Sequence, residues 1–241
     1  MNDQIPESAK PLHLVYDIYM KWPKKSKIPK FVQQGYDARD KAWSMVGTLE
    51  EDVLAPIINP AFSGLPMWPN LRQSYKIVHL NDGNDVIATD GLSDPFTSTH
   101  PMLSDKSGFM LELYMVTEDK LEVETAAKSW QMSVLFQASL QVAHHGQFRE
   151  LLDEHTYISL ELYDTAVPKE YQKEDRVGVL LGLESDTIPE SVELPRGDVK
   201  LVSVVVLDPK QTEEAAKNPE ARMKLAKKLK SKSNEPVSVL K

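Results

Sequence analysis

Residues 75–89 read Tyr-Lys-Ile-Val-His-Leu-Asn-Asp-Gly-Asn-Asp-Val-Ile-Ala-Thr, and they contain the strongest local folding signal in the chain. Two runs of β-forming residues flank Asp82 and Gly83, a pair that favours a tight turn because glycine supplies the positive φ that the turn requires. The stretch therefore predicts a β-hairpin with strands at 75–80 and 86–89.

Outward from the hairpin, apolar patterns predict further strands at 11–22, 108–116, 157–162, 177–183 and 201–207. The last two runs are continuously apolar, which is typical of central strands that are covered on both faces. In the strand at 108–116 the apolar residues alternate, so Phe109, Leu111 and Leu113 are expected on one face, with Met115 as a candidate for the same face.

Helical spacing of apolar residues predicts helices at 31–54, 125–145, 212–217 and 219–230. The second has a broad apolar face, which indicates a helix packed deep against a sheet, and Gly146 is well placed to end it. The proline-rich segment 64–69 predicts a buried irregular loop. Runs of strands with a few long helices predict the α+β class, with a mixed, largely antiparallel sheet flanked by helices.

The chain has 241 residues, enough to bury a core without disulfides or metals. We expect a strand and helix extension at 1–63 packed on the body, a domain at 64–210, and a basic helical tail at 211–241. The alternative is two subdomains that meet near residues 120–125.

The sequence contains no cysteine, which excludes disulfides, cysteine-ligated zinc and cysteine nucleophiles and fits a reducing compartment. The longest apolar runs are far shorter than the roughly 20 residues that a membrane helix needs. The first residues lack the apolar stretch of a signal peptide. We therefore expect a cytoplasmic protein that does not bind membranes.

The net charge of −8 is unevenly distributed, because residues 31–207 carry 13 basic and 28 acidic groups whereas both ends are basic. An acidic body repels phosphate backbones, which argues against nucleic-acid binding, and it attracts a basic partner protein. Acidic surfaces also simply keep proteins soluble, and that interpretation stays open.

Catalytic motifs are missing from the sequence: there is no glycine-rich phosphate loop and no nucleophile elbow. His144 and His145 are adjacent, so on a helix they point roughly 100° apart and do not chelate one metal. Residues 81–85 loosely resemble a calcium loop, but the hairpin turn already explains them. No catalytic residue, cofactor or metal site is predicted.

A dense cluster of turn-forming residues at 90–96 is the candidate binding site, together with a glutamate on the next strand. The candidate residues are Asp90, Gly91, Ser93, Asp94, Pro95, Phe96 and Glu112. A simpler interpretation is that they only shape the turn, since Pro95 restricts Asp94 to extended geometry. On that interpretation Asp94→Ala costs about 0.5–2 kcal/mol, as a lost cap or turn bond.

The same segment resembles the signature of the suppressor-of-fused domain family. In that family a strand ends in a Gly-Leu/Met-Ser-Asp turn, which stands here at 91–94, and a Gly-Phe-x-x-Glu-Leu strand follows, which stands here at 108–113. The resemblance covers roughly residues 64–210. The first 60 residues and the basic tail depart from it, so partner contacts there are not carried over.

The resemblance implies a mixed α/β domain that lacks catalysis and binds another protein. Animal members look like sequesterers of Gli-type transcription factors, which hold a short peptide as an added strand, and compact bacterial members look like immunity proteins that neutralise toxin domains. With one such domain, this chain resembles the bacterial kind. A protein-binding domain, with a basic toxin domain as one possible partner, is therefore the expected function.

Two alternatives stay open. A metal- or carboxylate-dependent hydrolase requires Asp90, Asp94 and Glu112 to converge in a cleft with shifted pKa values. A structural, oligomeric scaffold requires none of this. The sequence leaves the partner and the oligomeric state undetermined.

Overall fold

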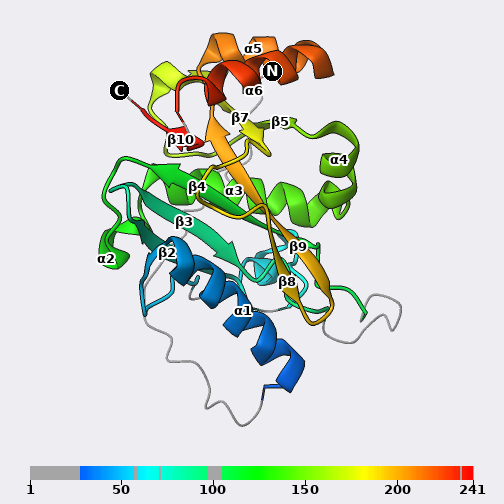
Figure 1. Cartoon of the computed structure of the whole chain (residues 1–241). Coiled ribbons are helices and arrows are strands. Elements are labelled where there is room, and N and C mark those ends of the chain that lie inside the picture. The colour runs from blue at the N-terminus through cyan, green and yellow to red at the C-terminus, as the bar shows by residue number, and fades with distance from the viewer. Residues whose placement is uncertain (1–27, 57–58, 71, 97–104, 234, 241) are drawn as a thin grey trace, which may run out of the picture.

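The chain folds into an open β-sheet with helices on both faces (Figure 1). The computed structural model describes residues 28–56, 59–70, 72–96, 105–233 and 235–240. The helices within them are α1 (Lys30–Val46), η2 (Pro60–Ser63), α2 (Val123–Ala126), α3 (Trp130–His145), α4 (Phe148–His155), η4 (Lys169–Tyr171), α5 (Pro209–Lys217) and α6 (Pro219–Lys230). None of them combines the length and apolar character of a membrane-crossing segment. The strand predicted at 11–22 lies outside the described residues.

The strands in the described residues are β1 (Gly47–Leu49), β2 (Ser74–Leu80), β3 (Asp85–Asp90), β4 (Leu111–Thr117), β5 (Ile158–Leu162), β6 (Gln172–Lys173), β7 (Arg176–Leu181), β8 (Ser191–Leu194), β9 (Gly197–Val206) and β10 (Val237–Ser238). Their main order is β1-β2-β3-β4-β9-β7-β5, while β10, β6 and β8 pair with β4, β7 and β9. Neighbours are antiparallel, except that β4 runs parallel to β9 and β10. The predicted α+β class and the mixed, largely antiparallel sheet are confirmed.

The predicted hairpin forms from β2 and β3, which are antiparallel neighbours. Hydrogen bonds from the Leu80 amide to the Asn84 carbonyl oxygen (2.8 Å) and from the Gly83 amide to the Leu80 carbonyl oxygen (3.1 Å) close the turn. Gly83 has a φ of 93°, a left-handed conformation that explains the glycine at this position.

Helix α1 is shorter than the helix predicted at 31–54, because the chain turns into strand β1 at Gly47. Thr48 pairs with His79 of β2 at this point. A Cβ atom on Gly47 would lie 2.3 Å from the His79 carbonyl oxygen, so only glycine allows this approach. Strand pairing therefore overrides the helical spacing beyond Val46.

The helix predicted at 125–145 is divided into α2 and α3. The Ser129 side chain caps α3 by accepting a hydrogen bond from the Met132 amide (3.1 Å), which starts a new helix within the apolar pattern. Gly146 ends α3 with a left-handed φ of 74°, and this confirms its predicted role.

The segment at 64–69 is irregular as predicted, but it is buried only at its end. Trp68 is 1% exposed, whereas Met67 is 60% exposed.

Adjacent residues of the strands alternate between two apolar layers, as the pleat of a sheet requires. Ile77 of β2 packs in the layer beneath α3, together with Met132. Val78 packs in the opposite layer, where Trp43 of α1 covers the sheet. On this second face, α5 and α6 cover strands β7 and β9, with Leu225 packed near Leu180 and Val205.

The central position of β7 and β9 confirms the prediction from their continuous apolar sequence. The strand predicted at 108–116 begins later, at Leu111, and all seven residues of β4 are buried. Leu111 and Leu113 pack in the layer beneath α3 with Phe109 against it, so the prediction that these three share one face is confirmed. Tyr114 and Val116 pack in the opposite layer, because β4 lies in the middle of the sheet with helices on both sides. Gly108 and Met110 have φ values of 51° and 58°, which are incompatible with a strand.

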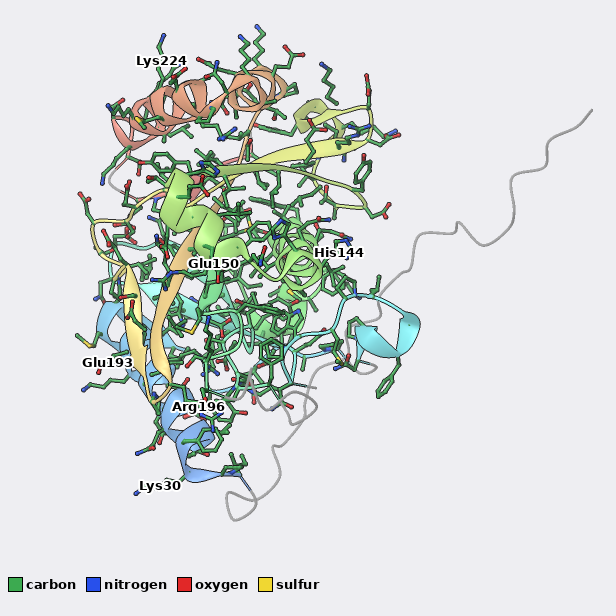
Figure 2. All side chains as sticks on the ribbon, turned by 90° about the vertical axis from the view of Figure 1, so that its right-hand side faces the viewer. Lys30, His144, Glu150, Glu193, Arg196 and Lys224 are labelled. Carbon is green, nitrogen blue, oxygen red and sulfur yellow. The ribbon has the colours of Figure 1, made fainter. Side chains whose placement is uncertain are left out.

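The C-terminal segment contains both predicted helices, α5 and α6. After α6 the chain forms β10, whose Val237 pairs in parallel with Val116 of β4. Lys224 on α6 and Lys30 at the start of α1 lie at opposite ends of the molecule (Figure 2). The division of the chain at residues 63 and 210 stays a prediction.

His79 connects the first three strands through two carboxylates. Its Nδ1 atom lies 3.0 Å from Oδ1 of Asp85, and its Nε2 atom lies 2.8 Å from Oε1 of Glu50. The hydrogen bond with Asp85 raises the pKa of His79, and Glu50 adds to the rise, although partial burial opposes it. A raised pKa means that protonation of His79 stabilises the fold.

We predict that His79→Gln lowers the free energy of unfolding more at pH 5.5 than at pH 8.5. The contribution of His79 is complete below its ordinary pKa of 6.5 and is lost as pH rises through the higher value in the folded state. Urea unfolding of both proteins at the two pH values measures the effect. The control is His144→Gln on the exposed end of α3; an equal loss for His79→Gln at both pH values would contradict the prediction.

Candidate functional site

The turn at 90–96 joins the end of β3 to the loop before β4 and depends on two close backbone approaches. A Cβ atom on Gly91 would lie 2.6 Å from the Arg72 carbonyl oxygen, and one on Gly108 would lie 2.3 Å from the Leu92 carbonyl oxygen. The Phe109 amide donates a hydrogen bond to that same Leu92 oxygen (2.9 Å). The glycines thus let the turn fold back against the start of β4.

Glu112 of β4 lies beneath this turn and accepts hydrogen bonds from several groups of it. The Gly91 and Ser93 amides donate to Oε1 at 3.0 Å each, and the Ser93 hydroxyl group donates to the same atom at 2.6 Å. The Thr89 hydroxyl group donates to Oε2 at 2.6 Å. The carboxylate is fully buried and replaces water as the acceptor for the turn.

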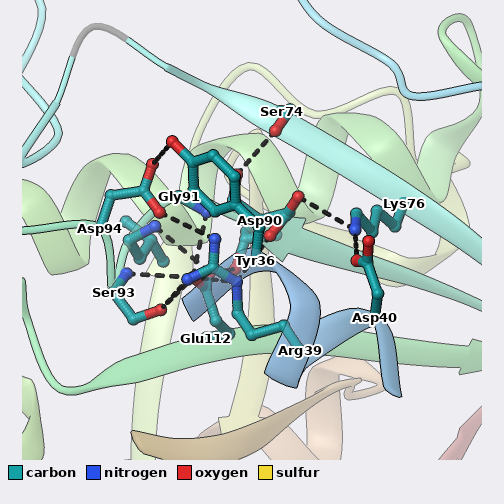
Figure 3. Close-up of polar contacts among 12 residues, drawn as sticks. Tyr36, Arg39, Asp40, Ser74, Lys76, Asp90, Gly91, Ser93, Asp94 and Glu112 are labelled. Atoms are coloured by element: carbon teal, nitrogen blue, oxygen red, sulfur yellow. Dashed lines mark hydrogen bonds and ion pairs between the residues drawn. The ribbon is translucent and has the colours of Figure 1, made fainter. Parts of the chain in front are cut away.

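Arg39 of α1 joins the turn from the other side and binds three of its residues (Figure 3). Nε donates to Oδ1 of Asp90 (2.7 Å), Nη1 to Oγ of Ser93 (2.9 Å), and Nη2 to Oδ1 of Asp94 (2.8 Å). Nε also lies 3.8 Å from Oε1 of Glu112. One guanidinium group, 2% exposed, therefore connects helix α1 to three carboxylates.

Two further cations, Lys76 of β2 and Arg72 just before that strand, complete the charge balance. Arg72 forms an ion pair with Asp90, and its Nη1 atom lies 3.6 Å from Oδ2 of Asp94. The Lys76 ammonium group lies 3.4 Å from Oδ2 of Asp90 and is also paired with Asp40. Three buried cations thus face three buried carboxylates. We call these six residues the corner: Arg39, Arg72, Lys76, Asp90, Asp94 and Glu112.

The charges fix the ionisation of Asp90 and Arg39. Burial is the largest influence on the pKa of Asp90 and raises it, but Arg72, Arg39 and Lys76 together hold the pKa well below its ordinary value. Burial lowers the pKa of Arg39, whereas Asp90 and Asp94 raise it by more. Both groups are therefore charged at neutral pH, and Asp90 loses its stabilising contribution only in acid.

The pKa values of Glu112 and of the neighbouring Tyr36 are raised, whereas that of Asp90 is lowered. Burial raises the pKa of Glu112, although Arg39 and the Ser93 hydroxyl group oppose the rise. Burial, followed by the charge of Asp94, raises the pKa of Tyr36 to about 12. The Tyr36 hydroxyl group, which donates to Asp94 Oδ2 at 3.3 Å, therefore stays protonated at neutral pH.

The structure brings together five of the seven candidate residues, namely Asp90, Gly91, Ser93, Asp94 and Glu112, and it buries all five. Pro95 and Phe96 lie at the rim and are partly exposed, with the Phe96 ring 5.4 Å from the ring of Phe109. Binding of a partner at this turn stays a prediction, and in this conformation only the two rim residues offer surface for it.

The opening beside Asp94 and Ser93 is too small for a substrate. This pocket, which Arg39 also lines, has a volume of about 10 Å³, close to the minimum that one water molecule needs. The three carboxylates converge, as a hydrolase would require, but around cations rather than in a cleft. Within the described residues, no cluster of three or more histidine and carboxylate side chains is arranged to hold a metal ion.

Comparison with known proteins shows a likeness in fold. No family model and no curated protein matches the sequence. The crystal structure of Drosophila Suppressor of Fused matches with a TM-score of 0.50 and 12% sequence identity, over 82% of this chain and 55% of that chain. The Sufu–Fu complex crystal structure matches with a TM-score of 0.50 and 13% identity, over 88% of this chain and 90% of that chain.

This likeness supports a structural relationship to Suppressor of Fused. The chain spans about 55% of the Drosophila protein in that structure, and at 12% identity the likeness establishes a shared fold alone.

We predict that Asp94→Ala destabilises the protein by about 3–5 kcal/mol, because it removes one carboxylate of a buried ion-pair network and leaves the Nη2 donor of Arg39 without its acceptor. This exceeds the 0.5–2 kcal/mol expected from the sequence. Urea unfolding at pH 7 measures the loss.

Asp82→Ala is the matched control, because the Asp82 carboxylate accepts a hydrogen bond from the Asn84 amide (2.9 Å) in an exposed turn. It is expected to cost about 0.5–1 kcal/mol, the range for a local capping bond. If the two substitutions destabilise equally, the buried ion pair does not hold the corner together.

Proposed function

We propose that this chain is a non-enzymatic protein-binding domain of the suppressor-of-fused type, which binds an extended segment of its partner along β5. The observation that carries the proposal is the outer edge of β5, which ends the sheet in the described part of the chain. The structural likeness supports it, because one of the similar structures is a complex of Sufu with Fu.

The register of β7 determines which groups β5 presents outward. The Leu207 amide donates to the Gly178 carbonyl oxygen (2.9 Å), and the Gly182 amide donates to the Ser203 carbonyl oxygen (3.1 Å). The even-numbered residues of β7 therefore turn their backbone polar groups toward β9, and the odd-numbered residues turn theirs toward β5.

Ile158, Leu160 and Leu162 stand opposite the odd-numbered residues of β7 and complete that ladder. Ser159 and Glu161 consequently direct their backbone N–H and C=O groups away from the sheet. Such groups on an edge strand are a template for the addition of another strand. The Ser159 hydroxyl group donates a long hydrogen bond to the Ala215 carbonyl oxygen of α5 (3.4 Å).

The acidic body supports a basic partner. Residues 31–207 contain 28 acidic and 13 basic groups, so long-range attraction would accelerate the approach of a basic protein. Following the resemblance to compact bacterial members of the family, we infer an immunity protein that neutralises a basic toxin domain in the cytoplasm. Co-purification with the product of a neighbouring gene tests this identity.

The converging carboxylates do not support a hydrolase, because they are buried and paired with cations and the adjacent pocket holds about 10 Å³. They support a structural role for the corner, which holds α1 against the sheet.

We predict that Ser159→Pro and Glu161→Pro each reduce capture of the partner from a lysate of the native host. Proline removes one outward N–H group and leaves the bonds to β7 in place, as edge strands tolerate. Quantitative pull-down with tagged protein measures the loss, which is expected to be about tenfold or greater.

Ser159→Ala and Glu161→Gln are the matched controls, because they change the same side chains and keep the backbone donor. They are expected to capture the partner as the original chain does. Unchanged capture by both proline variants, with thermal unfolding also unchanged, would refute binding along β5.

A further inference from the structure

A cavity of about 180 Å³ lies on the sheet face that α1, α5 and α6 cover. Its walls include Tyr114, Ile188 and Leu201 from the apolar cluster beneath α1, and Leu183 from the cluster beneath α5 and α6. The cavity therefore lies where these two clusters meet. It is smaller than pockets for drug-sized ligands, which measure about 300–1,000 Å³, and suits a single long side chain.

The charged residues that line the cavity are mainly acidic. Glu184 and Glu190 line it, and Lys200 is the basic residue of its lining. The Lys200 ammonium group already lies 3.4 Å from Oδ1 of Asp153. Glu184 accepts a hydrogen bond from the Tyr157 hydroxyl group (3.0 Å) and lies 3.7 Å from Nζ of Lys230, at an exposed position.

Behind this lining lies a buried carboxylate that is paired with no cation of the described residues. Glu235 is 8% exposed, and its partners within the described residues are neutral: the Ser185 hydroxyl group, the Thr187 hydroxyl group at 2.7 Å and the Thr187 amide at 3.2 Å. Ser185 itself lines the cavity. A buried anion without a countercharge favours the entry of a cation beside it.

Tyr114 does not offset this negative charge. Burial, followed by the charges of Glu235 and Glu184, raises the pKa of its hydroxyl group although a hydrogen bond with Ser203 opposes the rise, so the phenol stays neutral. Glu184 and Glu190 thus line a cavity with apolar walls and a neutral hydroxyl group, and Glu235 lies behind Ser185 of that lining.

We infer that this cavity binds an arginine side chain of the protein partner. Leu183, Ile188 and Leu201 provide an apolar surface for the methylene stem. Glu184 and Glu190 provide carboxylates for the guanidinium group, which pairs with carboxylates through two parallel donors and is more weakly hydrated than an ammonium group. The inference rests on the proposed function, because it assumes a basic protein partner, and it adds the anchor by which that partner is held.

The test uses two small probes, Nα-acetyl-arginine amide and its uncharged analogue Nα-acetyl-citrulline amide. Methyl NMR signals of Leu183, Ile188 and Leu201 report on the cavity. The arginine probe is expected to shift these signals at millimolar concentration, and the citrulline probe is not. Equal shifts with both probes, no shifts, or shifts with calcium or magnesium chloride alone would overturn the inference.

Glu184→Gln with Glu190→Gln is the test variant, and Glu193→Gln on β8 is the matched control at an exposed position (Figure 2). The double variant is expected to bind the arginine probe about tenfold more weakly, and the control with unchanged affinity. Unchanged binding by the double variant, with its methyl spectrum showing an intact fold, would also overturn the inference.

The inference and the proposed function fail separately. If a partner captured from the host binds the double variant as well as the original chain and still requires the β5 edge, the cavity is not the anchor and the proposed function stands. If the arginine probe binds but no protein partner depends on β5, the cavity binds guanidinium groups and the proposed function fails.

Discussion

The Arg39 guanidinium group binds Asp90, Ser93 and Asp94 at once, and the arrangement of α1 on the sheet depends on this interaction. A buried arginine is costly to desolvate, so it is tolerated only with carboxylates in good geometry. That requirement fixes the turn after β3 relative to a helix more than 50 residues earlier in the chain. Glu112 then fixes the same turn relative to β4 by accepting its amides. Helix, turn and central strand are thus held by one network.

The residues of this network have a structural role, and they are distinct from the surfaces that we propose for partner binding. Every carboxylate of the corner is paired with a cation or bonded by the turn, and the adjacent space of about 10 Å³ excludes a substrate. Two other features lie beyond the corner: the outer edge of β5, which ends the sheet within the described residues, and the acidic cavity near Glu184. The corner and the two surfaces proposed for binding share no side chains, so a change at either surface leaves the network intact.

Local sequence signals predicted the hairpin, the cap at Gly146, both C-terminal helices and the turn at 90–96, because each depends on neighbouring residues. The turn and Glu112 were grouped correctly, but Arg39, Arg72 and Lys76 were missed, since nothing local to the turn indicates its cations. A signal existed in α1, where Tyr36, Arg39 and Trp43 share one face at helical spacing. The predicted end of α1 was wrong because the pairing of Thr48 with His79 is a long-range contact.

The most direct test of the buried ion-pair network is the ionisation of Asp90, followed through the ¹³C chemical shift of its carboxyl group as the folded protein is acidified. The network predicts that this signal stays at its ionised position well below pH 3.8, the ordinary pKa of aspartate, for as long as the protein remains folded. A titration of Asp90 at or above pH 3.8 in the folded protein would contradict the account, because it would show a carboxyl group without its three cations.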